Sequence, residues 1–277
     1  MSKTERPAVS IVLGTFNRRP FLEAAIASVR ASLIGSPYEI IVVDGGSDDG
    51  TIDWLVRQHD IITIVQHNRV QVAGKSMRRR SWGYFMNLGF KCAEGRYICL
   101  LSDDCAVHPD TIANGLAQFD RDVGAGRLLG ALAFPWRSWP EEKNYRVCMT
   151  IGDNLMANYG LFLRDAVAEV GWIEEERYSF YHADADLSLK LRQAGYEIAI
   201  CEQALLEHYE RAGIALREGN LATDETDWKA LTARWRGIFF DPDSPKPGHW
   251  VTLDGIAARP ADHLFPDCAR AAARATE

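Results

Sequence analysis

The strongest constraint on the fold is the alternation of short apolar runs with amphipathic stretches over the first hundred residues. An apolar, β-branched run at 9–13 is broken by the loop 14–17, and Pro20 then opens an apolar-periodic stretch that ends near Leu33. This pattern predicts a strand, a loop and a helix, with proline at the start of the helix. Further strands are expected at 39–43, 61–65 and 97–101, and further helices at 51–58 and around 82–90. Apolar strands that alternate with helices predict an α/β fold whose mostly parallel sheet is buried on both faces.

The pattern becomes looser after Leu128. The sequence predicts a strand at 131–134, a polar and aromatic loop at 136–144, and a helix at 184–193 that Gly195 ends. From residue 210 onward a helix, a proline-rich run and an Ala/Arg-rich tail follow. We expect this last part to be an appendage to the main domain.

The composition argues against several classes of protein. Acidic residues outnumber basic ones by 38 to 31, so no overall positive field gathers nucleic acid, which we do not expect as a partner. Six scattered cysteines form no C-x-x-C pair, as is typical of reduced thiols in a cytoplasmic protein. The N-terminus lacks the apolar core of a signal peptide, and no run of about 18 apolar residues is present. We therefore expect a cytoplasmic protein without a membrane span.

Polar residues follow three of the expected strands, and ligands of open parallel sheets bind beyond the carboxyl ends of the strands. Thr15 and Asn17 follow the first strand, Asp44 follows the second, and an acidic pair follows the strand at 97–101. A dinucleotide site also has an acid after its second strand. However, the first loop, GTFNRRP, has one glycine where the dinucleotide fingerprint needs three. An NAD-dependent oxidoreductase is therefore the least favoured alternative.

The acidic pair is Asp103 and Asp104, and two carboxylates so close repel each other. A hard divalent cation, Mn²⁺ or Mg²⁺, would relieve this repulsion and bridge a diphosphate. A solvated turn at 102–104 would explain the same residues without a metal. The spacing alone leaves both interpretations open.

Four segments in the same order resemble glycosyltransferase family 2 of the GT-A fold: VSIVLGTFNR, EIIVVDGGSDDGT, NLGFKCAEGRYICLLSDDC and YHADADLSLKLRQAGY. The resemblance covers about residues 8 to 208. It implies a Rossmann-like, mostly parallel sheet flanked by helices in a domain at 1–209, with a nucleotide-binding half at 1–105 and an acceptor-binding half at 106–209. The remainder, 210–277, would be a small C-terminal extension, helical and irregular.

The same resemblance implies the activity. An enzyme of this family moves a sugar, with inversion at the anomeric carbon, from a nucleoside-diphosphate donor of the UDP or dTDP type. The implied acceptor is a hydroxyl of a glycan or of a lipid-linked glycan, as in polysaccharide biosynthesis. Peripheral association at the inner membrane face is compatible with such an acceptor, and the sequence does not indicate an oligomeric state.

The donor side is implied residue by residue. Thr15, Asn17 and Asp44 would hold the base and ribose, although Asp44 also suits a cap on the helix at 51–58. One of the basic residues Lys75, Arg78, Arg79 and Arg80 would meet the diphosphate, because guanidinium donors match phosphate oxygens. A charged run of this kind also suits a solvated face. The expected donor-side residues are Thr15, Asn17, Arg18, Asp44, Arg79, Arg80, Asn87, Ser102 and Asp103.

The resemblance also implies the metal ligands and the base. Asp104 would ligate Mn²⁺ or Mg²⁺, with His208 as a second ligand. Asp184 would be the general base that takes the proton of the acceptor hydroxyl, although an aspartate here also suits a helix N-cap. Acceptor-side candidates are Trp136, Tyr181 and Asp186, and further aromatic residues on that side are Trp139, Trp172 and Tyr178.

Three positions depart from the usual family pattern, because Gly45, Ser102 and Ala183 stand where the family commonly has an acid. These losses motivate one further alternative, a non-catalytic protein of the same fold that binds nucleotide-sugars.

Overall fold

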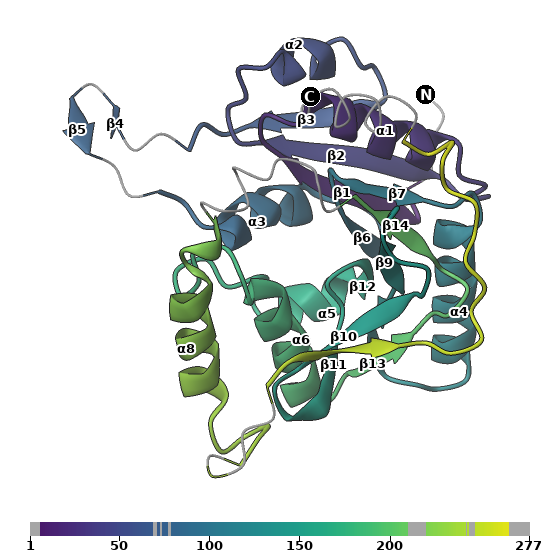
Figure 1. Ribbon diagram of the computed structural model, residues 1–277, viewed down its shortest axis with the longest axis vertical. Helices are drawn as coiled ribbons and strands as arrows, with labels where there is room; N and C mark the ends of the chain where they lie inside the picture. The colour runs from purple at the N-terminus through teal and green to yellow at the C-terminus, as the bar shows by residue number, and fades with distance from the viewer. Residues whose placement is uncertain are drawn as a thin grey trace.

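The computed structural model describes residues 6–68, 71–72, 74–76, 79–209, 220–241, 243 and 247–265. The elements of the first hundred residues are β1 (Val9–Thr15), α1 (Arg19–Arg30), β2 (Tyr38–Asp44), α2 (Thr51–Leu55), β3 (Ile61–Val65), β4 (Gln71–Val72), β5 (Lys75–Ser76), α3 (Trp82–Cys92) and β6 (Tyr97–Ser102). They confirm the predicted strands and helices of this region, with α1 and α2 three residues shorter at their ends than the sequence pattern indicated. The short β4–β5 pair projects away from the body of the protein (Figure 1).

The second half of the chain contributes to two sheets. Its elements are β7 (Cys105–Val107), α4 (Thr111–Gly124), β8 (Leu129–Ala133), β9 (Trp136–Ser138), β10 (Arg146–Thr150), η1 (Ile151–Asp153), β11 (Asn154–Met156), β12 (Gly160–Leu163), α5 (Arg164–Glu169), α6 (Ala183–Gln193), β13 (Glu197–Ile200), β14 (Leu206–His208), α8 (Asp224–Trp235) and β15 (His249–Thr252). The prediction of a loop at 136–144 was wrong at its start, because Trp136–Ser138 forms β9.

The central sheet has seven strands in the order β13-β8-β12-β6-β1-β2-β3. All neighbouring pairs are parallel except those of β12, which runs antiparallel to β6 and β8. The mostly parallel sheet of a GT-A fold is thus confirmed. A second sheet has the order β11-β10-β9-β14-β7, and β15 pairs with β10.

Both faces of the central sheet are buried, as the continuous apolar strands predict. Alternate residues of β1 serve opposite faces: Ile11 and Leu13 pack with α1 and α4, whereas Val12 packs with α3 and α6. Helix α3 approaches β1 closely, since a Cβ added at Gly89 would lie 2.5 Å from a methyl carbon of Val12. This packing fixes the direction of the strands and therefore the place where their carboxyl ends meet.

The described part of the predicted extension packs on the main domain. Leu231 and Trp235 of α8 are buried in the same apolar cluster as α6 (Figure 1). Strand β15 pairs antiparallel with β10, and Phe265 is fully buried against Trp139. The boundary at residue 209 stays a prediction, and residues 210–219 lie outside the described ranges.

Within the described ranges, no helix combines the length and the apolar character needed to cross a bilayer. Five cysteines are free thiols there, and Cys268 lies outside these ranges.

Candidate active site

The polar ends of β1, β2 and β6 meet at one edge of the central sheet. The strand register places Thr15 beside Asp44 and Gly14 beside Ser102. Ser102 is the last residue of β6 and the acidic pair follows it directly. The parallel sheet therefore brings together three segments that lie up to 90 residues apart in the sequence.

Asp44 is fully buried and closes the turn that follows β2. Its Oδ1 accepts hydrogen bonds from the backbone N–H groups of Gly46, at 2.7 Å, and Ser47, at 2.8 Å, while its Oδ2 accepts from the Ser47 hydroxyl. The N-cap position of α2 belongs to Gly50, and Asp49, one residue earlier, accepts the N–H of Thr51 at 3.0 Å through its Oδ1. Asp44 thus shapes the loop beside β1 and does not cap the helix.

Asn17 joins this loop to the loop after β1. Its backbone N–H donates to the Ser47 hydroxyl at 2.8 Å, and its side-chain oxygen accepts the N–H of Asp48 at 2.9 Å. Asn17 has a φ of 52°, in the left-handed region where asparagine is tolerated better than most residues. The two loops are therefore fixed to each other at the carboxyl edge.

The acidic pair after β6 is buried and has a counter-charge. Arg18 places Nη1 3.1 Å from Asp103 Oδ1 and 2.9 Å from Asp104 Oδ2. The hydroxyl of Thr15 donates to Asp103 at 2.8 Å. Burial raises the pKa of Asp103 to about 6, although the nearby Arg18 charge lowers it. One guanidinium offsets two carboxylates only partly, so the cluster still favours an added cation.

His208 lies on the other side of Asp104. Its Nε2 is 3.3 Å from Asp104 Oδ1, and β14 brings it there by pairing antiparallel with β7. The same pairing sets His208 directly opposite Cys105. The ligand atoms of Asp104, Cys105 and His208 all lie within 4.8 Å of one another and are buried.

These three residues fit a divalent cation. A carboxylate oxygen, an imidazole nitrogen and a thiol suit a transition metal better than Mg²⁺, which prefers oxygen ligands throughout. Sequence reasoning missed Cys105, because its proximity to His208 depends on the pairing of β7 with a strand a hundred residues later. Tyr159 hydrogen-bonds the Cys105 thiol, and burial raises the pKa of that thiol well above its ordinary value.

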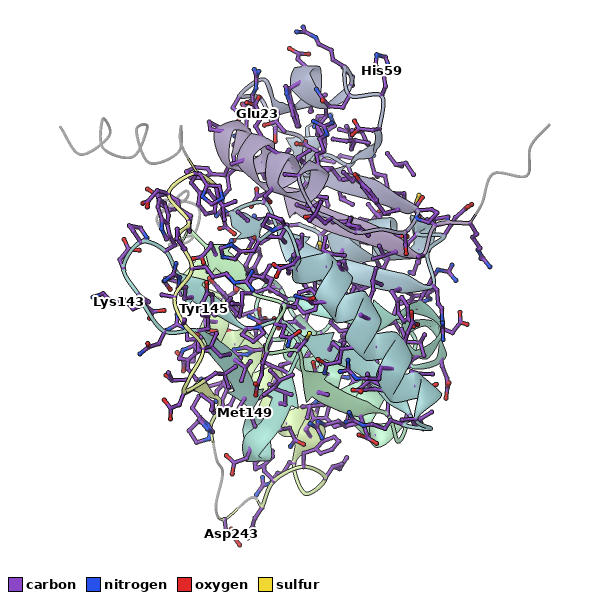
Figure 2. The ribbon with its side chains drawn as sticks, turned by 90° about the vertical axis from the view of Figure 1, so that its right-hand side faces the viewer. Glu23, His59, Lys143, Tyr145, Met149 and Asp243 are labelled. Atoms are coloured by element: carbon purple, nitrogen blue, oxygen red, sulfur yellow. The ribbon has the colours of Figure 1, made fainter. Side chains whose placement is uncertain are left out.

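A buried network behind His208 holds strand β14. Glu207 is fully buried and accepts hydrogen bonds from Arg137 Nε at 2.7 Å and from the Tyr145 hydroxyl at 2.5 Å. Its Oε1 also lies 2.9 Å from His108 Nε2. Figure 2 shows Tyr145 inward of the exposed loop that carries Lys143. Since Glu207 precedes His208 on one short strand, this network fixes the position of the imidazole.

Asp184 lies in the first turn of α6. The N-cap position belongs to His182, whose φ is 66°, and no side chain caps the helix there. The carboxylate of Asp184 accepts the N–H of Ala185 at 2.8 Å. Burial raises the pKa of Asp184, which the charge of His182 partly opposes. A carboxylate with a raised pKa is a stronger base near neutral pH than an ordinary aspartate.

Helix α8 holds the segment that leads to Asp184. Buried Asp227 accepts three consecutive backbone N–H groups, those of Ser179, Phe180 and Tyr181, at 2.8, 2.9 and 3.0 Å. His182 Nε2 lies 2.9 Å from Asp224 of the same helix. Sequence reasoning missed both contacts, because they join residues more than 40 positions apart.

Asp186 is fully buried between α6 and α8. Its carboxylate accepts hydrogen bonds from the Tyr178 hydroxyl and from Trp235 Nε1, both at 2.9 Å, and from Arg234 at 3.2 Å. The three hydrogen bonds give Asp186 a structural role, because they hold α6 and α8 together. Its predicted acceptor-side role stays untested.

We expect Asp227→Ala to lower the rate of the sugar transfer that the sequence resemblance implies by about tenfold or more, since small displacements of a catalytic group can reduce rates by up to 10². Affinity for nucleoside diphosphate should change less than about twofold, because the hydrogen bonds of Asp227 hold the segment 179–181 and not the loops that carry Asp44 and Asp104. Steady-state rates and calorimetry would measure the two effects. Asp227→Asn, which keeps one acceptor oxygen, should recover part of the rate, and Glu225→Gln on the exposed face of α8 is the matched control. Equal transfer by Asp227→Ala and the control would contradict the positioning role.

The aromatic candidates divide into two groups. The ring of Trp136 lies 5.2 Å from that of His208 and is 3% exposed. Tyr181 lies at the loop before α6, with its ring 6.4 Å from that of His182. Trp139, in contrast, stacks on Phe265 in a separate apolar cluster. Tyr178 and Trp172 make structural contacts: the Tyr178 hydroxyl donates a hydrogen bond to Asp186, and the ring of Trp172 lies under Arg164.

Three donor-side candidates lie around α3. The side chain of Asn87 is buried and makes hydrogen bonds to Ile173 and Glu175, which fix the loop before α6. Arg80 lies over the ring of Tyr84 at 4.7 Å, and Arg79 is exposed. A phosphate contact by either arginine stays a prediction, and Arg78 lies outside the described residues.

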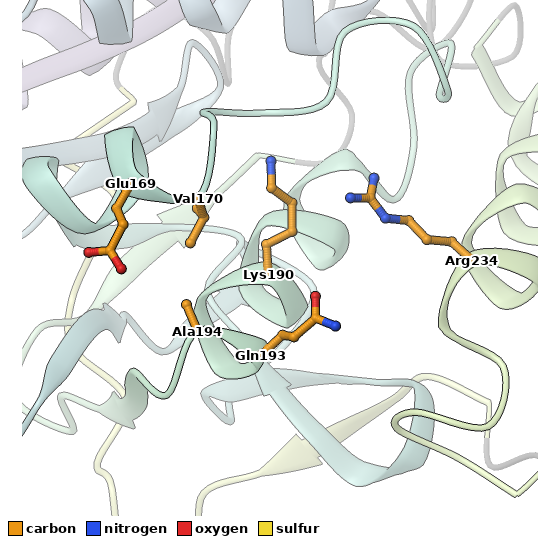
Figure 3. A pocket seen from close by; sticks show the side chains of 6 residues that line it. All are labelled: Glu169, Val170, Lys190, Gln193, Ala194 and Arg234. Atoms are coloured by element: carbon orange, nitrogen blue, oxygen red, sulfur yellow. The ribbon is translucent and has the colours of Figure 1, made fainter.

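A depression of about 280 Å³ lies at the other end of α6 (Figure 3). Its lining includes Lys190, Gln193 and Arg234, and it contains none of the acids at the strand ends. We assign no role to it.

Comparisons with known proteins identify the family. The model of Glycosyl transferase family 2 matches residues 10–166, more than half of the chain. Chondroitin synthase of Pasteurella multocida is 21% identical over 271 residues, which cover 82% of this chain and 26% of that protein. Glycosyltransferase AglE of Haloferax volcanii is 22% identical over 215 residues, covering 74% of this chain and 68% of that protein. The chain thus spans about a quarter of the length of the chondroitin synthase.

Solved structures agree on the fold. S. aureus TarS 1–349 in complex with UDP-GlcNAc has a TM-score of 0.56 at 17% identity, over 74% of this chain and 59% of that one. The mannosyltransferase PcManGT from Pyrobaculum calidifontis, in complex with GDP-Man and Mn²⁺, has a TM-score of 0.57 at 18% identity, over 99% and 76%.

The mixed α/β fold with its mostly parallel central sheet matches the GT-A fold of these solved structures. The chain belongs to glycosyl transferase family 2, and the predicted family, fold class and enzyme class are confirmed.

Proposed function

We propose that this enzyme transfers a sugar from a nucleoside-diphosphate donor to a hydroxyl of a glycan acceptor, with inversion at the anomeric carbon. The observation that carries the proposal is the convergence of Asp44, Asp104 and His208 at the carboxyl edge of β1, β2 and β6, the edge where open parallel sheets bind ligands. Nucleotide-sugars are bound by two proteins of similar fold, TarS and PcManGT.

The donor lies along this edge. Its base and ribose lie on the loops after β1 and β2, which Thr15, Asn17 and Asp44 build, in the nucleotide-binding half, residues 1–105. UDP and dTDP donors are the first candidates. The diphosphate lies toward Ser102 and the acidic pair, where Arg18 supplies a positive charge.

Asp104 and His208 would hold a divalent cation, with the Cys105 thiol close enough to join them. A bound Mn²⁺ or similar ion would supply positive charge against the charge that develops on the leaving nucleoside diphosphate. Arg18 keeps the two buried aspartates close together before the ion arrives, because its guanidinium reduces their repulsion.

Asp184 acts on the acceptor side, residues 106–209. Its carboxylate takes the proton of the acceptor hydroxyl as that oxygen bonds to the anomeric carbon. The bond from the anomeric carbon to the phosphate oxygen breaks at the same time, and its electron pair leaves with the nucleoside diphosphate. A single displacement from the face opposite the leaving group inverts the configuration, and no covalent enzyme intermediate forms.

We expect Asp44→Ala to weaken nucleoside diphosphate binding by about tenfold or more without any metal, the scale of losing hydrogen bonds to a charged group, because the buried carboxylate holds the turn at 45–47 on which the base and ribose lie. Calorimetry in the presence of a chelator would measure this loss. Because Asp44 also closes the turn at 45–47, Asp44→Asn serves as the fold control: it keeps an oxygen for the Gly46 and Ser47 N–H groups. Asp48→Ala, at an exposed position of the same loop, should bind like wild type. Equal metal-free affinities for Asp44→Ala and wild type would contradict the assignment.

A thermal-shift comparison of nucleoside diphosphates tests the donor class. A ligand that binds only the folded protein raises the melting temperature by mass action. We expect at least one of UDP, dTDP and GDP to raise it, and Mn²⁺ to increase that shift. No shift with any of them, at millimolar concentration with Mn²⁺, would contradict the proposed function.

A further inference from the structure

The second sheet carries an arginine between two tryptophans. Arg146 of β10 places its guanidinium 4.3 Å from the ring centre of Trp136 on β9 and 4.7 Å from that of Trp250 on β15. The two indole rings are 5.0 Å apart and nearly perpendicular. Glu142 and Ser138 bind the guanidinium at 2.6 and 3.0 Å, which fixes its plane. These contacts hold Trp250 in one place.

Trp250 is half exposed, whereas Trp136 beside it is buried. An apolar ring face bordered by a guanidinium and a carboxylate matches a sugar ring, which has apolar C–H faces and a rim of hydroxyls.

The surface formed by Trp136, Arg146 and Trp250 connects the two ends of the proposed reaction centre. At one end, the ring of Trp136 lies against that of His208. At the other end, Cys148 stands two residues after Arg146 on β10, directly opposite Trp250 on β15. On its other edge β10 pairs with β11, where Cys148 lies opposite Met156, and α6, the helix that carries Asp184, packs against β11. A ligand on Trp250 would therefore lie on the sheet that carries His208 and that packs against the helix of the base.

We propose that strand β15 builds the acceptor subsite: a sugar ring of a saccharide acceptor stacks on Trp250, and Arg146 contacts its hydroxyls. This inference rests on the proposed function and deepens it, because it assigns a residue of the C-terminal segment to recognition of the acceptor. Removal of Trp250 is expected to weaken sugar binding about tenfold, the scale of one aromatic stacking contact together with its buried area.

Saturation-transfer NMR on the full chain tests the proposal with defined probes. The samples contain UDP or dTDP with Mg²⁺, and methyl β-glycosides of glucose, galactose and N-acetylglucosamine below their dissociation constants. For wild type we expect saturation of the ring C–H protons of at least one glycoside. The signal should fall about tenfold in Trp250→Ala and largely return in Trp250→Phe, which keeps an aromatic face. Ile238→Ala removes an apolar side chain of similar exposure and should behave like wild type.

Two results would overturn the inference: equal sugar signals from wild type and Trp250→Ala, or no sugar signal from wild type with any glycoside. The nucleotide protons in the same samples report on the donor side separately. Saturation of the nucleotide without a Trp250-dependent sugar signal would remove the acceptor subsite and leave the proposed function standing. Absence of nucleotide saturation for both UDP and dTDP would count against the proposed donor itself.

Discussion

Asp184→Asn is expected to lower the rate of sugar transfer by about 10²–10⁴-fold, the usual scale for loss of general-base help. Donor affinity and melting temperature should stay close to those of wild type. The amide keeps an oxygen that accepts the Ala185 N–H, so the first turn of α6 is retained. It cannot take up the proton of the acceptor hydroxyl near neutral pH. Initial-rate assays with calorimetry and thermal melts would measure all three quantities.

The pH dependence gives the same variant a second readout. The base acts when it is deprotonated, so wild-type transfer should fall as pH falls through the pKa of Asp184. Burial raises that pKa above the ordinary value of 3.8, so the loss should occur at a higher pH than for an exposed aspartate. The residual rate of Asp184→Asn should not show this fall with pH, whereas the rate of Asp165→Asn, a change at an exposed position of α5, should show it. Near-normal transfer by Asp184→Asn would remove Asp184 as the base, and the search would turn to Asp186 and His182.

Asp104→Ala should have the second largest effect, on donor binding that depends on the divalent cation. Loss of supporting residues around a metal commonly lowers affinity by 10- to 100-fold, so loss of a direct ligand should lower it by about 100-fold or more. The fold should persist, since Arg18 still pairs with Asp103. Calorimetry with donor and Mn²⁺, with and without chelator, would measure the change, and Asp120→Ala on exposed α4 is the control. If the metal-dependent part of the affinity were unchanged, Asp104 would not be a metal ligand.

The central sheet could be predicted from the sequence because the pattern that indicates each strand lies within that strand. Strands such as Val9–Thr15 and Tyr97–Ser102 are apolar throughout, and a parallel sheet buried on both faces requires that pattern. Strand β9 was missed for two reasons. Its three residues include a charged arginine, and they form a strand only because they pair with residue 146 and with residues 206–208. Pairings across such distances leave no local pattern.

The candidate site could be predicted in part for the same reason. Strand ends are visible in a sequence, so Asp44, Asp103 and Asp104 were found as a group. Their partners were not found, because no local pattern indicates that Arg18 bridges the acidic pair or that Cys105 faces His208. Because Arg18 already offsets part of the repulsion between Asp103 and Asp104, that repulsion alone is weak evidence for a metal.

The C-terminal segment shows most clearly which contacts cannot be predicted from the sequence. Helix α8 and strand β15 have ordinary polar sequences, and the prediction made them an appendage. Their importance comes from single side chains that reach distant elements, with Asp227 on the backbone at 179–181 and Trp250 on Arg146. Contacts of this kind follow from the tertiary packing of whole elements and not from the composition of either segment.

One measurement tests the central claim most directly: the release of nucleoside diphosphate from a panel of UDP-, dTDP- and GDP-sugars by the wild-type enzyme with Mn²⁺, with the anomeric configuration of any glycoside product read by NMR. We predict that at least one donor is cleaved, that chelation and Asp184→Asn each suppress the release, and that an α-linked donor yields a β-linked product. A protein that binds these donors and cleaves none would contradict the account and support a non-catalytic role, and a product of retained configuration would contradict the single displacement at Asp184.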